Sequence, residues 1–150
     1  MEQKRRILPP IWFLLALGLA VALHYLLPIA RLLSPPWSYA GAVLVIVGIV
    51  MSAAGSSAFR RVGTPVVPFE PSTVLVTDGL YRFTRNPMYL GLVLSLIGVA
   101  ILLGSLSAWL PVPIFVWILQ TQFINGEERF LEEIFGARYL EYQKRVRRWL

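Results

Sequence analysis

The uncharged stretch from Trp37 to Ala58, WSYAGAVLVIVGIVMSAAGSSA, decides the fold class. It is close to the ~20 residues that a helix needs to cross ~30 Å of hydrocarbon. The whole chain of 150 residues shares this character, with 57% hydrophobic and only 15% charged residues. Soluble domains carry roughly 25% charged residues. The sequence therefore predicts an integral membrane protein.

Three further apolar stretches flank this one, at about residues 9–33, 87–106 and 107–124. Each is long enough to span a bilayer as a helix. The short turn over residues 104–107 leaves room only for a tight helical hairpin, and Pro111 and Pro113 should disturb the first turns of the last span. We predict a single integral-membrane domain over residues 1–150, all-α and polytopic, with four transmembrane helices.

The basic residues predict the orientation of these spans, because cytoplasmic loops are enriched in Lys and Arg. With four spans, 13 of the 14 basic residues lie on one side, and Arg31 alone lies on the other. All eight acidic residues share the basic side. We expect both termini and any polar active site to be cytoplasmic, in a prokaryotic cell membrane. The basic residues of that side are Lys4, Arg5, Arg6, Arg60, Arg61, Arg82, Arg85, Arg129, Arg138, Lys144, Arg145, Arg147 and Arg148.

Composition also excludes several kinds of site. The chain has no cysteine and one histidine, His24, so it cannot form disulfides, thiolate nucleophiles, Cys-based zinc sites or a multi-His metal site. We predict no metal. The basic residues that give the net charge of +6 flank the apolar spans, which favours contact with membrane lipids over nucleic acid. His24 is expected to form a hydrogen bond within the bundle.

Two segments lie outside the predicted spans. In the loop over residues 60–86, the run Val74-Leu75-Val76 is too short for a span and fits either a strand or an extended strap against the bundle. The tail over residues 125–150 carries apolar residues at spacings of three and four, with a break at Phe135-Gly136, which predicts a cytoplasmic amphipathic helix. This helix would lie on the membrane surface or fold under the bundle and cap a site.

The residues before the third span form the densest polar cluster. Pro87 suits a first helical turn and Asn86 the N-cap position, so the helix begins with free amide groups and a partial positive charge. With Arg85 beside it, this start suits a carboxylate or phosphate. Tyr81 and Tyr89 add aromatic faces. Alternatively, these side chains simply anchor a membrane helix at the interface.

The adjacent carboxylates Glu127 and Glu128 form a second cluster beyond the fourth span. Carboxylates so close to the membrane need solvent or a partner. They can pair with Arg85, bind ribose hydroxyls or hold an ammonium group. Alternatively, they begin a surface helix, whose first turn favours acidic residues.

Four stretches in this order resemble the integral-membrane methyltransferases, a group that includes isoprenylcysteine carboxyl methyltransferases and phospholipid N-methyltransferases. They are LVTDGLY (residues 75–81), RNPMYLG (residues 85–91), Glu127-Glu128 and FGARYLEY (residues 135–142). The resemblance implies S-adenosylmethionine as methyl donor, bound at the cytoplasmic face. Two positions depart from the family pattern: Asn86 stands where a histidine is frequent and Phe123 where a substrate-linked arginine is known. The donor contacts that the resemblance implies are Thr73, Val74, Leu75, Val76, Gly79, Tyr81, Asn86, Pro87, Met88, Tyr89 and Glu127.

Methyl transfer needs alignment and exclusion of water more than a nucleophilic side chain. We take Arg85 and Glu128 as the candidate catalytic residues, with Glu128 as a proton acceptor. The acceptor is expected to be lipid-like, and Phe123 favours a phospholipid amine over a prenylcysteine carboxylate. An NADPH-dependent membrane reductase and a non-enzymatic lipid-binding four-helix protein are the alternatives from other classes.

Overall fold

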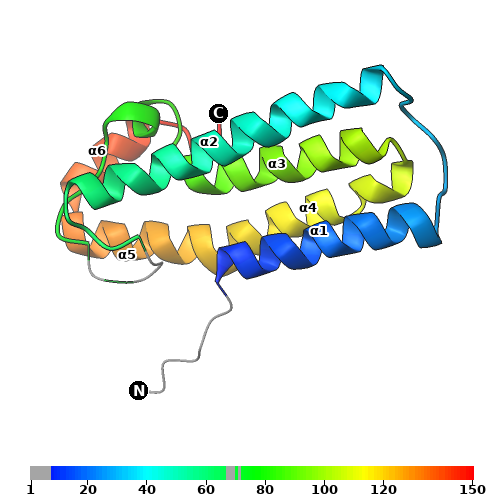
Figure 1. The fold of residues 1–150 in the computed structure, drawn as a ribbon. Coiled ribbons are helices and arrows are strands. Elements are labelled where there is room, and N and C mark those ends of the chain that lie inside the picture. The colour runs from blue at the N-terminus through cyan, green and yellow to red at the C-terminus, as the bar shows by residue number, and fades with distance from the viewer. Residues whose placement is uncertain (1–7, 67–69, 71) are drawn as a thin grey trace.

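A computed structural model describes residues 8–66, 70 and 72–150 of the chain. These residues form an elongated bundle of long helices, with two shorter helices and a loop gathered at one end (Figure 1). Lys4, Arg5, Arg6 and Glu2 lie outside the described residues. In the described part of the chain there is no strand, only an isolated bridge between Arg31 and Ser105. The all-α prediction is confirmed.

The bundle consists of α1 (Pro9–Leu26), α2 (Ala40–Arg61), α3 (Pro87–Leu103) and α4 (Pro111–Ile118). A π-helical segment (Leu119–Ile124) joins α4 to α5 (Asn125–Phe135), which α6 (Ala137–Arg145) follows. The described residues also include three short 3₁₀ segments: Trp37–Tyr39, Gly79–Arg82 and Leu106–Trp109. Within the same part of the chain, three helical stretches are long and apolar enough to cross a membrane: Pro9–Leu26, Trp37–Arg61 and Leu106–Phe135. A fourth apolar helix, Pro87–Leu103, is shorter, at 17 residues.

Glycines allow α2 and α3 to pack backbone against backbone. Gly48 and Gly91 face each other, and a Cβ on either would lie 2.4 Å from the carbonyl oxygen of the other. Gly41 and Gly98 make the same contact, seven residues before Gly48 in α2 and seven residues after Gly91 in α3. Small residues are common at membrane helix interfaces because they permit such close approach. This contact fixes α3, whose first residues carry the predicted site, against α2.

The first predicted span was too long, because its helix ends at Leu26 instead of residue 33. The following chain pairs with the turn between α3 and α4: Leu32 and Leu33 donate backbone hydrogen bonds to Gly104, and Leu106 donates to Ala30. Gly104 adopts the left-handed conformation (φ 73°) that ends α3 and makes the hairpin tight. Nearby, a 2.8 Å hydrogen bond joins His24 Nδ1 and Ser105 Oγ, as expected for a bundle residue.

The predicted fourth span and the first part of the tail form one helix. Helix continues without a break from α4 through the π-helical segment into α5, so Glu127 and Glu128 belong to the same long helix as the span. The break comes only at Gly136, where φ is 52° and ψ is −125°. This backbone conformation is essentially restricted to glycine. It redirects α6, so the tail is two helices instead of one.

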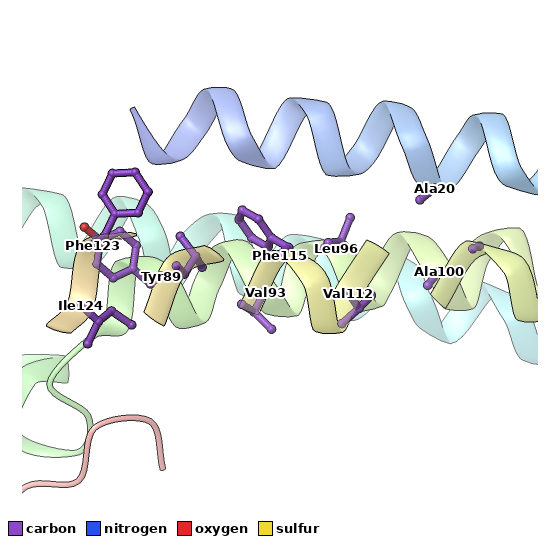
Figure 2. Packing of buried hydrophobic residues seen from close by; sticks show 11 residues of the cluster. Ala20, Tyr89, Val93, Leu96, Ala100, Val112, Phe115, Phe123 and Ile124 are labelled. Carbon is purple, nitrogen blue, oxygen red and sulfur yellow. The ribbon is translucent and has the colours of Figure 1, made fainter. Parts of the chain in front are cut away.

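The main hydrophobic core runs along the bundle between α1, α3 and α4 (Figure 2). It extends from Phe123 and Tyr89 at one end to Ala20 and Ala100 toward the other. Leu96, Leu119 and Ile124 are fully buried within it, and a smaller cluster centred on Tyr139 and Tyr142 packs under the loop end. The two clusters frame the region in which the predicted site residues lie.

Candidate functional site

The end of the bundle where α2 stops and α3 starts contains a cavity of about 60 Å³, the inner cavity. Its walls come from α2, from the strap at residues 72–76, from the start of α3, and from α5 and α6. Val74-Leu75-Val76 forms no strand, so of the two structures considered for this run the strap is the one present. The inner cavity is lined by Phe59, Ser72, Val74, Leu75, Val76, Tyr81, Arg85, Asn86, Met88, Tyr89, Glu127, Glu128, Leu131, Tyr139 and Tyr142.

Tyr89 and Glu127 meet across this cavity from α3 and α5. The Tyr89 hydroxyl donates a 2.7 Å hydrogen bond to Glu127 Oε1. Tyr89 is 5% exposed, and its ring packs against Phe123 with centroids 6.3 Å apart. Glu127 forms no ion pair with any cationic residue that the structure describes, and its carboxyl group can accept further hydrogen bonds.

Glu128, in contrast, is held by two arginines. Arg85 Nη2 donates to its Oε1 at 2.8 Å, and Arg148 contacts both of its oxygens. The side chains of Arg85 and Glu128 are each only 12% exposed. Charge-assisted pairs of this kind are strong where solvent is excluded. The pairing of Glu128 with Arg85, one of the alternatives for the carboxylate pair, is therefore present.

The last residues of the chain run beside the start of α3. Asn86 lies at the N-cap as predicted but does not cap the helix with its side chain, because its Nδ2 donates instead to the Arg148 carbonyl at 2.9 Å. Thr84 Oγ1 donates to the same carbonyl, and the Arg85 amide donates to the Arg147 carbonyl. The amide groups of the first turn of α3 consequently have no side-chain cap.

Two tyrosines of α6 complete the floor of the inner cavity. The Tyr142 hydroxyl donates a 2.6 Å hydrogen bond to the Tyr81 carbonyl. Burial raises the pKa of Tyr139 to about 12, with a further contribution from Glu128. Burial likewise raises the pKa of Tyr81 above its ordinary value. The hydroxyls of Tyr81 and Tyr139 are therefore protonated at neutral pH and can donate hydrogen bonds.

The inner cavity brings together most of the residues predicted from the sequence. Three predicted residues do not line it: Pro87 is buried in the first turn of α3, Gly79 begins a 3₁₀ segment and is exposed with φ 61°, and Thr73 of the strap bonds to Thr64. Sequence reasoning missed Phe59, Ser72, Leu131, Tyr139 and Tyr142. The two tyrosines stand in the family-like stretch of residues 135–142, which was the one available signal.

A second hollow, the side groove, is formed by the start of α1, the second half of α2 and the start of α3. Its volume is about 250 Å³ and its lining is mostly apolar. The side groove is lined by Leu8, Pro9, Pro10, Ser52, Ser56, Val66, Met88, Tyr89 and Leu92.

Comparison with known proteins identifies the family of this chain. A family description, phospholipid methyltransferase, matches residues 37–138, from the start of the second span to α6. The chain belongs to the phospholipid methyltransferase family. The match includes the strap, the start of α3 and the Glu127-Glu128 pair, so the family region contains nearly all of the inner cavity.

Relatives of this family member carry a more specific name. This chain is 32% identical over 108 residues to protein-S-isoprenylcysteine O-methyltransferase A of Arabidopsis thaliana. The matched region covers 71% of this chain and 55% of the relative. The chain is 38% identical over 114 residues to protein-S-isoprenylcysteine O-methyltransferase of Saccharomyces cerevisiae, covering 71% and 45%. The chain thus spans about half the length of the curated relatives it matches.

Proposed function

We propose that this protein is an S-adenosylmethionine-dependent methyltransferase that esterifies the carboxylate of a prenylcysteine-like lipid at the cytoplasmic face of the membrane. The observation that carries the proposal is the inner cavity, in which Arg85, Tyr89 and Glu127 converge from separate segments. Membership of the family supports methyl transfer as the chemistry.

The polar groups of the inner cavity fit the methyl donor. Arg85 Nε is buried and has no hydrogen-bond partner among the described residues, and the first turn of α3 lacks a side-chain cap. Together they suit the α-carboxylate of the donor. Glu127 suits its ammonium group or ribose hydroxyls, and the strap residues suit the adenine. When bound, S-adenosylmethionine supplies a methyl group on a sulfonium sulfur, which is electrophilic.

The chain's own residues then orient the two reactants and exclude water. Tyr89 holds Glu127 in place, and Arg85 is held by Glu128 and by the carbonyls of Gln143 and Val146. Such preorganised groups need not rearrange during the reaction. The carboxylate of a prenylcysteine is already ionised near neutral pH, so this acceptor requires no base, and Glu128 can remain in its ion pairs.

Two observations favour the carboxylate over the phospholipid amine that the sequence suggested. The relatives are named isoprenylcysteine O-methyltransferases. Phe123, the basis for the amine, is 2% exposed within the core and lines neither the inner cavity nor the side groove. The presence of a phenylalanine at position 123 is therefore explained by core packing and carries no information about the acceptor's head group.

Incubation of the solubilised protein with deuterated-methyl S-adenosylmethionine tests the proposal. N-acetyl-S-farnesylcysteine and phosphatidylethanolamine are offered in parallel, and the lipid extract is analysed by mass spectrometry. We expect a labelled methyl ester on the farnesylated acceptor. A labelled amine would restore the phospholipid acceptor, whereas binding of labelled NADPH without S-adenosylmethionine binding would favour a membrane reductase.

Replacing Glu127 by glutamine should weaken donor binding while keeping the fold. A hydrogen bond to a charged group contributes about 1.5–3 kcal/mol, so the affinity for S-adenosylmethionine should fall roughly ten- to a hundred-fold in calorimetric titration. Glu133→Gln, an exposed position on the same helix, is the matched control and should bind normally. Equal affinity of Glu127→Gln and the wild type would remove Glu127 from the donor site.

The proposed topology has four membrane-crossing helices with the inner cavity and both termini on the cytoplasmic side. Because the chain has no cysteine, single-cysteine variants report sidedness directly. Ser34→Cys, exposed between α1 and α2, and Glu133→Cys, exposed on α5, should react with an impermeant maleimide from opposite sides of the membrane. Labelling of both from one side would contradict the topology.

A further inference from the structure

Met88 and Tyr89 are the two residues that line both the inner cavity and the side groove. Arg85 and Glu127 line only the inner cavity, whereas the start of α1 and the serines Ser52 and Ser56 of α2 line only the side groove. Among the residues that the structure describes, this pair is therefore where a lipid in the side groove would meet the inner cavity.

The two residues differ in how firmly they are held. Tyr89 is fixed by its hydrogen bond to Glu127 and by its packing against Phe123. Met88 is half-buried, and its side chain ends in a flexible thioether. The adjustable part of the wall is thus the Met88 side chain.

Residues of α2 position this side chain. Ser52 Oγ donates a 2.8 Å hydrogen bond to the Met88 backbone carbonyl, and Ser56 Oγ shares its proton between the Ser52 carbonyl at 3.0 Å and Met88 Sδ at 3.2 Å. Gly55 gives the side chain room, because a Cβ there would lie 2.7 Å from Met88 Cγ. Ser52 therefore holds the Met88 backbone, whereas Gly55 and Ser56 set the position of its side chain.

We infer that Met88 is a specificity-determining residue: its side chain forms the partition between donor and acceptor and limits which acceptors reach the inner cavity, with Ser56 as a positioning residue. The inference rests on the proposed function. It requires that Met88 be accessible to ligands from both sides, whereas Ser72 lines only the inner cavity and Ser52 only the side groove.

Single cysteines again provide the test, at positions 88, 72 and 52. Ser72 lines only the inner cavity, and Ser52 lines only the side groove. Each variant is alkylated with a small maleimide in the presence of S-adenosylhomocysteine or N-acetyl-S-farnesylcysteine. At ten times the Kd, a bound ligand should slow alkylation of a covered thiol about tenfold.

We expect S-adenosylhomocysteine to protect positions 72 and 88, and the farnesylated acceptor to protect positions 52 and 88. If only one ligand protects position 88 while positions 72 and 52 respond as stated, the role of Met88 is overturned and the proposed function stands. Absence of protection at position 72 by S-adenosylhomocysteine overturns the proposed function and the inference with it.

Kinetics supply a second, independent test. Met88→Ala should shift the ratio of kcat/KM between a bulky N-benzoyl farnesylcysteine and the N-acetyl compound about tenfold toward the bulky acceptor, because small changes in pocket size change rates by about this factor. Met88→Leu, which conserves volume, should leave the ratio unchanged. Leu92→Ala, in the side groove alone, is the control, and the same shift in that variant would overturn the inference.

Discussion

Replacing Gly91 by alanine should separate α2 from α3 and strongly destabilise the protein. The added Cβ would lie 2.4 Å from the Gly48 carbonyl oxygen and 2.7 Å from the Ser52 backbone nitrogen. Backbone atoms cannot step aside as side chains do, so the helices must move apart along their whole contact. Overpacking typically lowers the free energy of unfolding by about 1–3 kcal/mol. A clash with backbone atoms belongs at the upper end of this range, about 3 kcal/mol.

Thermal unfolding in detergent, followed by the fluorescence of the five tryptophans, measures this effect. Gly18→Ala is the matched control, because Gly18 is an exposed glycine of α1 with nothing within 4 Å of an added Cβ. Alanine there should leave the melting temperature unchanged or raise it slightly, since alanine is the better helix former. Equal melting temperatures of Gly91→Ala and the wild type would show that the glycine contact does not hold the helices together.

Replacing Glu128 by glutamine should destabilise the fold more than it affects methyl transfer chemistry. Arg85 is 12% exposed and would lose its partner charge while remaining buried. Removing one partner of a buried ion pair costs about 3–5 kcal/mol of stability. Because this pair is partly exposed, we expect a loss at the lower end, about 3 kcal/mol. The start of α3 and the last residues of the chain should loosen together, because Arg85 joins both.

Arg148→Gln is the comparison for this variant. Arg148 is 33% exposed, and its removal leaves the Arg85–Glu128 pair intact, so the loss of stability should be clearly smaller. Unfolding midpoints rank the two variants. If instead Glu128→Gln melts like the wild type but no longer turns over, Glu128 takes part in the reaction and is not a structural anchor.

Some features of the fold followed from the sequence because they depend on local chemistry. Uncharged runs such as residues 37–58 must be buried in lipid or protein, and in lipid only a helix satisfies its own backbone. Gly104 and Gly136 ended helices where the sequence placed breaks, since glycine alone adopts these conformations readily. The motifs around Asn86 and Glu127 also predicted which segments supply the candidate site.

Other features depended on contacts between distant segments, and for these the sequence was misleading. Residues 27–33 are apolar, but they pair with the α3–α4 turn instead of extending α1. Asn86 has the residue type of a helix cap, yet its amide binds the Arg148 carbonyl, which lies 62 positions further along the chain.

The sequence by itself determined that this protein is an all-helical membrane protein, that its polar chemistry gathers around two short clusters, and to which family it is similar. Only the tertiary structure decided the different environments of Glu127 and Glu128, and which residues separate the inner cavity from the side groove. Adjacent residues on a helix point about 100° apart, so neighbours of the same type meet different partners. Hydrophobic burial is non-directional and can be recognised from composition, whereas hydrogen bonds and ion pairs depend on where distant segments meet.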